Sequence, residues 1–589
     1  MEMEKKNLAI IVLAIVLAAS GVGNIVLGAM LGIIEIAPPP GNTLIWGMGA
    51  APPYLDPTDS WDSQANVVIR QCSESLWWYN YSDPDLPLIR VLAASETWVS
   101  TTQLRVTLRQ GVFFHDGTAF NADAAIWNLE RLEYLCNHTG ALDPVTQRRA
   151  KTASLYEFPD GSPIIDHFTK VSEFVFDIFL TAPFSDLLDI YAYVCGNMLS
   201  PTAHAAQAHR FITLQEVLVG TGPFIYESYV ADTEVRFSKY ENYNGPPGWE
   251  DPAYFDVLIF SIIADPPTRN YAMLAGDIDW IQGPITDLYD TYRMDPLITF
   301  YESEIPGFGF SYLGMNNHLI NVTWRKAISY AVNYTYVISD YQQDTVLRAY
   351  GPISPAFGAY YKPGFETIAP VMNYSIARQE IVNGLGGDAR VLGLGTEDFG
   401  VNPTTDTNWE NWAQELNNLI SFNYSGNADN QFRADMLPML QLWLSRIGIY
   451  VEDGLTFWSY FLKMLHGFTP NGFDDLSLYW VGWGPDYLSP MNQIQPLMQN
   501  ASESNSAQVN DPWLEDQFVK WSITTDLATR IEMIHNISTY IATVLYSHVW
   551  SFHPKVLSIH AADLYDCPYN ALGNFWAYPV KRNETWTPF

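Results

Sequence analysis

Gly482-Trp483-Gly484-Pro485-Asp486-Tyr487 follows the apolar, strand-like run of residues 478–481. Glycine lets the backbone approach a ligand closely, while Trp483 offers a flat stacking face and Asp486 offers a fixed negative charge. This arrangement is typical of a turn that captures a small molecule with a cationic or hydroxyl-rich end. The same residues would also occur where a buried tryptophan lies beside an aspartate that caps a turn. The rest of the chain has to decide between a binding role and this structural role.

The length and composition of the chain predict a large, acidic, multidomain protein. With 589 residues, 48% of them hydrophobic, the chain can bury large cores. Its net charge of −34 comes from 64 acidic and 30 basic residues. Such a surface repels nucleic acid and favours solubility, so no polyanionic partner is expected.

The N-terminal segment has the features of a membrane anchor. Residues 7–34 carry no charged side chain, and about 20 apolar residues are enough to span a bilayer as a helix. Lys5 and Lys6 precede this run, so the positive-inside rule places everything after it outside the cell. We expect residues 1–36 to be a signal or transmembrane anchor and residues 37–42, which are rich in proline, to be a short stalk. Cleavage of the anchor stays open, because the small-residue sites are imperfect.

Two sequence features agree with an extracellular address. Nine Asn-x-Ser/Thr sequons predict a glycosylated protein. They lie at Asn80, Asn137, Asn321, Asn333, Asn373, Asn423, Asn500, Asn536 and Asn583. The chain also has four widely spaced cysteines with no metal-type spacing, for which one or two disulfides are expected, with all three pairings open. These are Cys72, Cys136, Cys195 and Cys567.

Strand-like and helix-like segments alternate along the chain and predict α/β architecture in more than one lobe. Residues 104–118 read as strand, glycine turn, short strand and Asp-Gly turn. Asn121 is a predicted cap for a helix over about 124–135. Apolar spacing further predicts helices over residues 66–78 and 527–550.

The order of the motifs resembles that of the extracellular solute-binding proteins of family 5, the peptide-, nickel- and oligosaccharide-binding components of ABC importers. The resemblance extends over nearly all of residues 43–580. The matching stretches are residues 55–57, 108–118, 220–224, 325–333, 447–449 and 482–486.

The resemblance implies a two-lobed, periplasmic-binding-protein-like (type II) α/β fold with an extra domain inserted in the first lobe. Lobe I is expected at 41–80, 216–310 and 551–589, the inserted domain at 81–215 and lobe II at 311–550. In such proteins the ligand lies between the lobes, which close on it by a hinge motion.

The resemblance also assigns ligand-binding residues. Asp486 matches the aspartate that pairs with a peptide's α-amino group, while Gly482 and Gly484 match positions near the ligand backbone. First-lobe contacts are expected from Trp61 and Ser63. The remaining predicted binding residues are the aromatic residues Trp480, Trp483 and Tyr487.

One position departs from the pattern of the peptide-binding relatives. Some of them carry an arginine for the ligand's carboxylate where this chain has Trp480. No lysine or arginine lies between Lys463 and Lys520. The departure favours a sugar, because aromatic faces stack on pyranose rings.

We therefore expect an extracellular substrate-binding component of an ABC importer that captures peptides or oligopeptides and delivers them to a membrane permease. An oligosaccharide-binding protein of the same family and a glycosylated surface protein that reuses the fold stay open as alternatives. The chain has no His-Glu-x-x-His, Gly-x-Ser-x-Gly or glycine-rich phosphate loop. No enzymatic activity, metal site or cofactor is expected.

Overall fold

The computed structural model describes residues 42–586 apart from 84–85, 386–389, 392–393 and 525. The predicted anchor, residues 1–36, and all of the predicted stalk except Asn42 lie outside the described residues. Among the helices that are described, none combines the length and apolarity needed to cross a bilayer.

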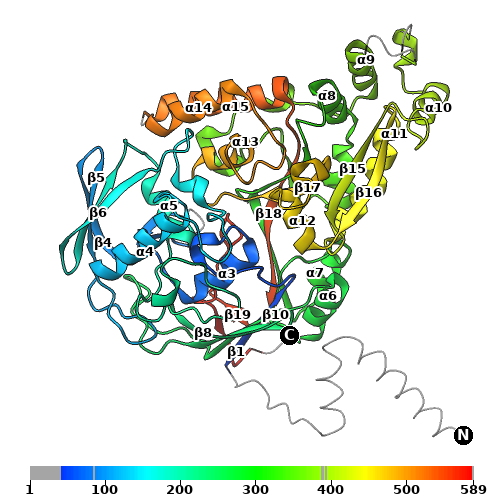
Figure 1. Cartoon of the computed structure of the whole chain (residues 1–589). Coiled ribbons are helices and arrows are strands. Elements are labelled where there is room, and N and C mark those ends of the chain that lie inside the picture. The colour runs from blue at the N-terminus through cyan, green and yellow to red at the C-terminus, as the bar shows by residue number, and fades with distance from the viewer. Residues whose placement is uncertain (1–41, 84–85, 386–389, 392–393, 525, 587–589) are drawn as a thin grey trace, which may run out of the picture.

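A twelve-stranded sheet runs through the molecule (Figure 1) in the order β16-β15-β17-β13-β18-β11-β1-β10-β9-β8, with β12 and β14 also paired to β18. Its strands are β1 (Thr43–Met48), β8 (Phe224–Val230), β9 (Glu234–Lys239), β10 (Val257–Ile262), β11 (Trp280–Ile281), β12 (Ile298–Pro306), β13 (Phe310–Met315), β14 (Val346–Arg348), β15 (Ile420–Asn427), β16 (Ile449–Thr456), β17 (Leu478–Trp483) and β18 (His548–Ala561).

The long strand β18 joins the two halves of this sheet. Its first residues pair with β13, where Val549 lies opposite Leu313. Its last residues pair with β11 and β12, where Ile559 lies opposite Ile281 and Phe300. The predicted boundary between residues 550 and 551 therefore falls inside one continuous strand.

A separate antiparallel sheet, β4-β5-β7-β6, lies at one end of the molecule (Figure 1). It is formed by β4 (Ala93–Ser100), β5 (Gln103–Leu108), β6 (Ile165–Ser172) and β7 (Val175–Leu180). Its buried residues belong to the same core cluster as those of β1 and β10. The sheet lies within the predicted insertion, 81–215; the predicted extents of the insertion and of the lobes stay predictions. The remaining pairs are β2 (Trp77–Tyr79) with β3 (Leu88–Arg90) and β19 (Leu564–Tyr565) with β20 (Lys581–Arg582).

Side-chain caps begin many of the helices. Asn121 accepts the backbone N–H of Ala124 at the start of α4, as predicted, and Asp62 caps α3 in the same way. The helices are α3 (Ser63–Cys72), α4 (Ala122–Leu135), α5 (Leu187–Ala192), α6 (Pro266–Ala275), α7 (Tyr289–Met294), α8 (Val322–Ala331), α9 (Tyr374–Leu385), α10 (Pro403–Asn411), α11 (Gln431–Ser445), α12 (Trp458–Leu465), α13 (Gln495–Met498), α14 (Pro512–Ile523) and α15 (Leu527–Tyr540).

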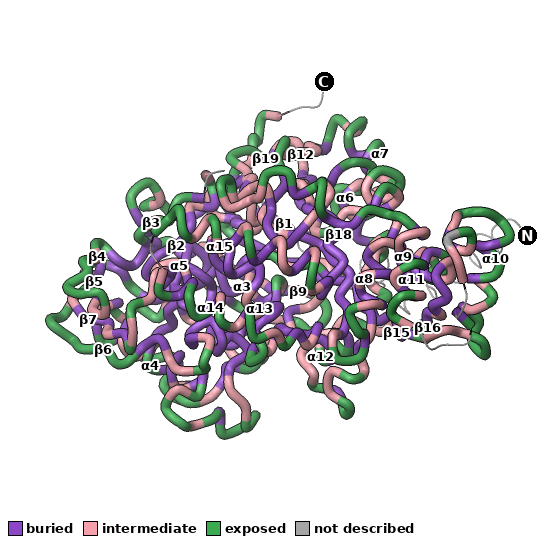
Figure 2. The backbone as a smooth tube through the Cα atoms, turned by 90° about the horizontal axis from the view of Figure 1, so that it is seen from above, coloured by how far each residue is buried: buried purple, intermediate pink, exposed green. Residues whose placement is uncertain are grey.

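Figure 2 shows buried residues along β1 and β18 at the centre of the molecule, and exposed residues around the tips of β4–β7 and around α10. Strands β1 and β10 and the β4–β7 sheet share one core cluster, whereas two other clusters fill the two sides of β17. Residues of β18 take part in all three clusters: Ala561 packs against the first, Phe552 belongs to the second and Trp550 to the third.

The expectation of disulfides is wrong, because all four cysteines are free thiols. Cys72 lies in α3 with its Sγ 3.4 Å from the carbonyl oxygen of Ile69. The Sγ of Cys195 lies 2.9 Å from the hydroxyl of Tyr156. These contacts are internal to the core, where burial raises the pKa of both thiols.

Candidate functional site

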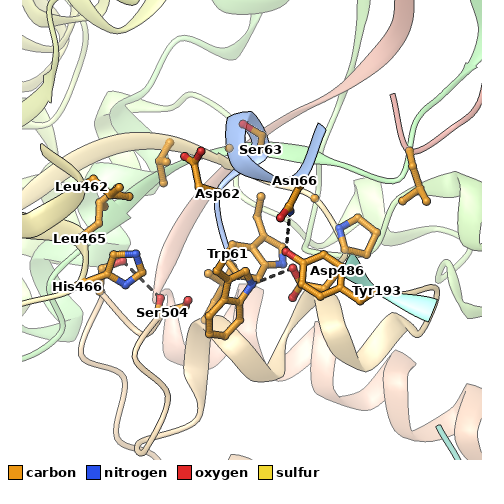
Figure 3. Close-up of a pocket in the computed structure, with 18 of the residues that line it drawn as sticks. Trp61, Asp62, Ser63, Asn66, Tyr193, Leu462, Leu465, His466, Asp486 and Ser504 are labelled. Carbon is orange, nitrogen blue, oxygen red and sulfur yellow. Dashed lines mark hydrogen bonds between the residues drawn. The ribbon is translucent and has the colours of Figure 1, made fainter. Parts of the chain in front are cut away.

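A cavity of about 290 Å³ lies between the lobes. One wall comes from α3 and the loop before it, together with Leu572 and Asn574 near the C-terminus. The facing wall comes from α12, from the end of β17 and from the turn that follows β17 (Figure 3). Six predicted binding residues line it: Trp61, Ser63, Gly482, Trp483, Gly484 and Asp486.

Asp486 lies where the two walls meet. Its Oδ1 accepts a hydrogen bond of 2.8 Å from Nε1 of Trp61, a residue 425 positions away in the chain (Figure 3). Its Oδ2 lies 3.3 Å from Nδ2 of Asn492. The backbone N–H of Asp486 donates to Oδ1 of the same asparagine at 2.6 Å. Donors from both lobes therefore hold the carboxylate in one orientation.

The environment of Asp486 disfavours its negative charge. Burial raises the pKa of Asp486 to about 7, and the hydrogen bonds from Asn492 and Trp61 oppose the shift only in part. Asp486 as a whole residue is partly exposed, and it lines the cavity. No lysine, arginine or histidine forms an ion pair with Asp486 in the described part of the chain. A cation that entered the cavity would supply the missing charge.

Two tryptophans form an aromatic corner beside Asp486. The rings of Trp61 and Trp483 meet edge to face, with centroids 6.0 Å apart and planes at 64°. The Nε1 of Trp483 donates to the carbonyl of Asn492 at 3.1 Å, so each indole N–H has a partner. The corner is rigid and offers apolar surface to a ligand.

The start of α3 is held by a capping carboxylate and a hydrogen-bond network. Asp62 accepts the backbone N–H groups of Gln64 and Ala65 at 2.9 and 3.1 Å. Burial raises the pKa of Asp62 to about 6. On the next turn, Asn66 donates to the hydroxyl of Tyr193 at 2.8 Å. This network fixes the polar face of α3 against the cavity.

The opposite wall contributes a neutral histidine. Nδ1 of His466 lies 3.1 Å from the carbonyl oxygen of Glu503. Because a carbonyl only accepts, Nδ1 carries the proton and Nε2 is left as an acceptor. Burial lowers the pKa of His466 to about 4, so the ring is uncharged at pH 7.

Residues 88–505 match the family model "Bacterial extracellular solute-binding proteins, family 5 Middle". The chain belongs to this family. Its members are solute-binding proteins, and the expectation of a binding protein rather than an enzyme agrees with that assignment.

Two relatives in sequence and one in structure show how far the similarity of this family 5 protein extends. The heme-binding protein A of Haemophilus influenzae is 27% identical over 295 residues, 46% of this chain and 49% of its own length. The glutathione-binding protein GsiB of Pectobacterium atrosepticum is 28% identical over 328 residues, 55% of each chain. The chain thus spans about half the length of the curated relatives that it matches.

The structural relative is the ABC transporter-associated periplasmic binding protein DppA from Helicobacter pylori, in complex with peptide STSA. It has a TM-score of 0.76 at 18% sequence identity and covers 92% of this chain and 98% of its own. This similarity shows a two-lobed α/β fold of the periplasmic-binding-protein kind.

Two of the predicted binding residues of this family 5 protein lie away from the cavity. Side chains alternate along β17, so Trp480 points into the core of lobe II on the opposite side of the strand from Val481. Its Nε1 donates to Oγ of Ser311 at 2.8 Å, and its ring is fully buried. Tyr487 is packed into the core of lobe I. Neither residue lines the cavity, and three aromatic residues that were not predicted line it instead: Tyr193, Tyr312 and Trp458.

The predicted glycosylation sites of this family 5 protein all reach the surface. The asparagines at 137, 321, 373, 500, 536 and 583 are exposed, and those at 80, 333 and 423 are partly exposed. Accessibility is what attachment of a glycan requires, and the sites stay predictions.

Among the cavity residues that the sequence analysis missed are Asn66, Arg70, Tyr193 and His466. The sequence around these residues carries no motif, and Tyr193 is far in the sequence from the segments that form the two walls. The polar spacing 63, 66 and 70 on one face of α3 is the one signal that could have indicated part of this set. Among the described residues, no group of three or more histidine, cysteine or acidic side chains is placed to hold a metal.

Proposed function

We propose that this protein is the extracellular substrate-binding component of an ABC importer, which captures short peptides between its lobes and delivers them to a membrane permease. The observation that carries the proposal is the enclosed carboxylate of Asp486, oriented by Trp61 and Asn492 and without a cationic partner in the described chain. A peptide's α-ammonium group would form a charge-assisted hydrogen bond there. The glutathione-binding relative and the peptide-bound DppA agree with such a ligand.

An oligosaccharide is the second candidate ligand, and the aromatic corner of Trp61 and Trp483 favours it. Sugars stack on such faces, and Asp486 would then accept a hydroxyl group. The third candidate is a glycosylated coat protein that reuses the fold. The intact cavity argues against this candidate, because a coat protein does not need one. The N-terminal anchor, the glycans and the permease belong to the proposal as well.

The arrangement of the lobes supports capture by closure. Asp186, next to the β4–β7 sheet, accepts a 2.8 Å hydrogen bond from Arg530 of α15 and a longer one of 3.4 Å from Nε1 of Trp521. The Arg530 guanidinium also lies 3.9 Å from the centre of the Trp521 ring. A second ion pair across the lobes joins Arg149 to Glu503. We propose that these pairs stabilise the closed form of the protein.

Asp186→Asn is expected to weaken ligand binding about 3- to 30-fold without altering the cavity. In the proposed closed form Arg530 would keep its charge but lose its buried carboxylate partner, whereas the open form would be unaffected. The population of the closed form would therefore fall, and the apparent Kd would rise in proportion. Calorimetry with a bound peptide measures the change. Asp516→Asn, which removes an exposed ion pair with Lys520 on α14, is the matched control and should leave affinity unchanged. Equal affinities in the two variants would contradict closure through Asp186.

Calorimetric titration of short peptides between pH 5 and pH 9 tests the proposed function. With its pKa near 7, Asp486 must ionise to pair with an ammonium group, so affinity should fall about tenfold per pH unit below 7. Above about pH 8 the peptide's own amine loses its proton, which places the optimum between roughly 7 and 8.

The matched ligands for this titration are the N-acetylated form of each peptide and a panel of oligosaccharides. The acetylated peptides should bind weakly, and their affinity should not fall as the pH is lowered below 7. Tight binding of an oligosaccharide with no peptide binding would replace the proposal by its second candidate.

A further inference from the structure

A buried arginine in the cavity wall has no acidic partner. Arg70 lies in the last turn of α3, lines the cavity and is 3% exposed. Its Nε has no hydrogen-bond acceptor, and no carboxylate of the described residues forms an ion pair with its guanidinium. The guanidinium lies over the ring of Tyr81, with Cζ 4.8 Å from the ring centre. Burial raises the pKa of the Tyr81 phenol, and the charge and hydrogen bond of Arg70 oppose this shift only in part, so Tyr81 stays neutral.

The other buried arginines of the described chain show what Arg70 lacks. Arg131 donates to the carboxylate of Asp56, and Arg378 donates to that of Asp406. Arg269 and Arg325 each donate to several backbone carbonyl groups. Burying a charged group is costly unless oxygen acceptors replace its hydration. Among the described residues, Arg70 is therefore the buried arginine that has neither a carboxylate nor a backbone carbonyl as acceptor and is left with the neutral phenol of Tyr81.

The position of Arg70 sets it apart from Asp486 along the cavity. Ser63, Asn66 and Arg70 recur at helical spacing, so α3 turns one polar face to the cavity. Trp61, which donates a hydrogen bond to Asp486, lies two residues before this helix, whereas Arg70 lies in its last turn. Seven residues of helix rise on the order of 10 Å. An extended peptide of about two or three residues covers that length.

We propose that Arg70 is a specificity-determining residue that binds the carboxylate of the ligand, so that the cavity selects short peptides with both termini free. The planar guanidinium matches a carboxylate with two parallel hydrogen bonds, which gives it geometric selectivity. Asp62, the other carboxylate of the α3 wall, is occupied by two backbone N–H groups and leaves Arg70 free. This inference rests on the proposed function, because it assumes that the ammonium end lies at Asp486.

The test compares a di- or tripeptide as the free acid and as the C-terminal amide, by calorimetry at pH 7.5. The folded protein should prefer the acid about 100-fold. Arg70→Met, which keeps length but removes charge, should bind both forms within about threefold of each other, and Arg70→Lys should be intermediate. Arg105→Met, in the β4–β7 sheet, is the control that should keep the full preference.

Each outcome decides between two roles of Arg70. Equal binding of acid and amide by the unmodified protein overturns the inference but leaves the amine-dependent function intact. An acid preference that survives in Arg70→Met, with folding confirmed by circular dichroism, would make Arg70 a structural residue stacked on Tyr81. If Arg70→Met does not fold, the Arg70→Lys result and the unmodified protein decide alone. Absence of any peptide binding would refute the proposed function and this inference together.

Discussion

Asp486→Asn is expected to weaken binding of peptides with a free α-amino group about 30- to 4,000-fold. The substitution keeps the size of the side chain but removes the charge with which a ligand's ammonium group would pair. Losing one partner of an enclosed charge pair costs about 2–5 kcal/mol, and each 1.4 kcal/mol is a factor of ten in affinity. Asp486→Ala should abolish detectable binding, because it also removes the acceptor of Trp61.

Calorimetry of the same peptide with both variants measures the effect, and its N-acetylated form is the control ligand. The acetylated peptide carries no ammonium group, so its weak binding should change little in Asp486→Asn. Thermal unfolding should remain cooperative, since the backbone N–H of Asp486 still bonds to Asn492. Unaltered affinity for the free peptide would show that Asp486 has another role.

Trp480→Ala is expected to lower the free energy of unfolding by about 3–5 kcal/mol, the usual cost of truncating a fully buried aromatic residue. The ring lies edge to face with Phe432, at 5.2 Å between centroids, inside the core of lobe II. Its removal would also leave Oγ of Ser311 without its donor. Urea denaturation followed by circular dichroism measures the loss.

Trp98→Ala is the matched control, because this tryptophan is 43% exposed on β4. Its truncation should change stability by no more than about 0.5 kcal/mol. If Trp480→Ala were as stable as Trp98→Ala but lost ligand binding, Trp480 would be a binding residue after all.

Local patterns in the sequence predicted the elements where one physical cause dominates. Asn121 begins α4 because its side chain supplies a cap whatever lies nearby. The predicted helix over 66–78 instead ends at Cys72, and Trp77–Tyr79 forms β2 against β3. Apolar residues occur at helical spacing there, but the aromatic run is buried by strand pairing, which no local pattern indicates.

The same limit applies to the C-terminal part of the chain. The predicted helix over 527–550 is α15 up to Tyr540 and continues as a π-helical turn over Ile541–Leu545. Tyr546 then takes a left-handed backbone conformation before β18 begins at His548. The apolar stripe of the helix and the apolar run of the strand are continuous in sequence. The strand pairs with β13 on one side and with β14 on the other, and this pairing decides where the helix ends and β18 begins.

The sequence by itself determined the family, the strand and turn of residues 478–487, and the presence of a carboxylate and an indole on that turn. These follow from residue types at short spacing, which act through glycine geometry and side-chain chemistry within one segment. The tertiary structure decided that Trp61 orients Asp486, that Trp480 faces the core and that Arg70 enters the cavity wall. Those outcomes depend on burial and on contacts between residues hundreds of positions apart, and only the folded chain brings such residues together.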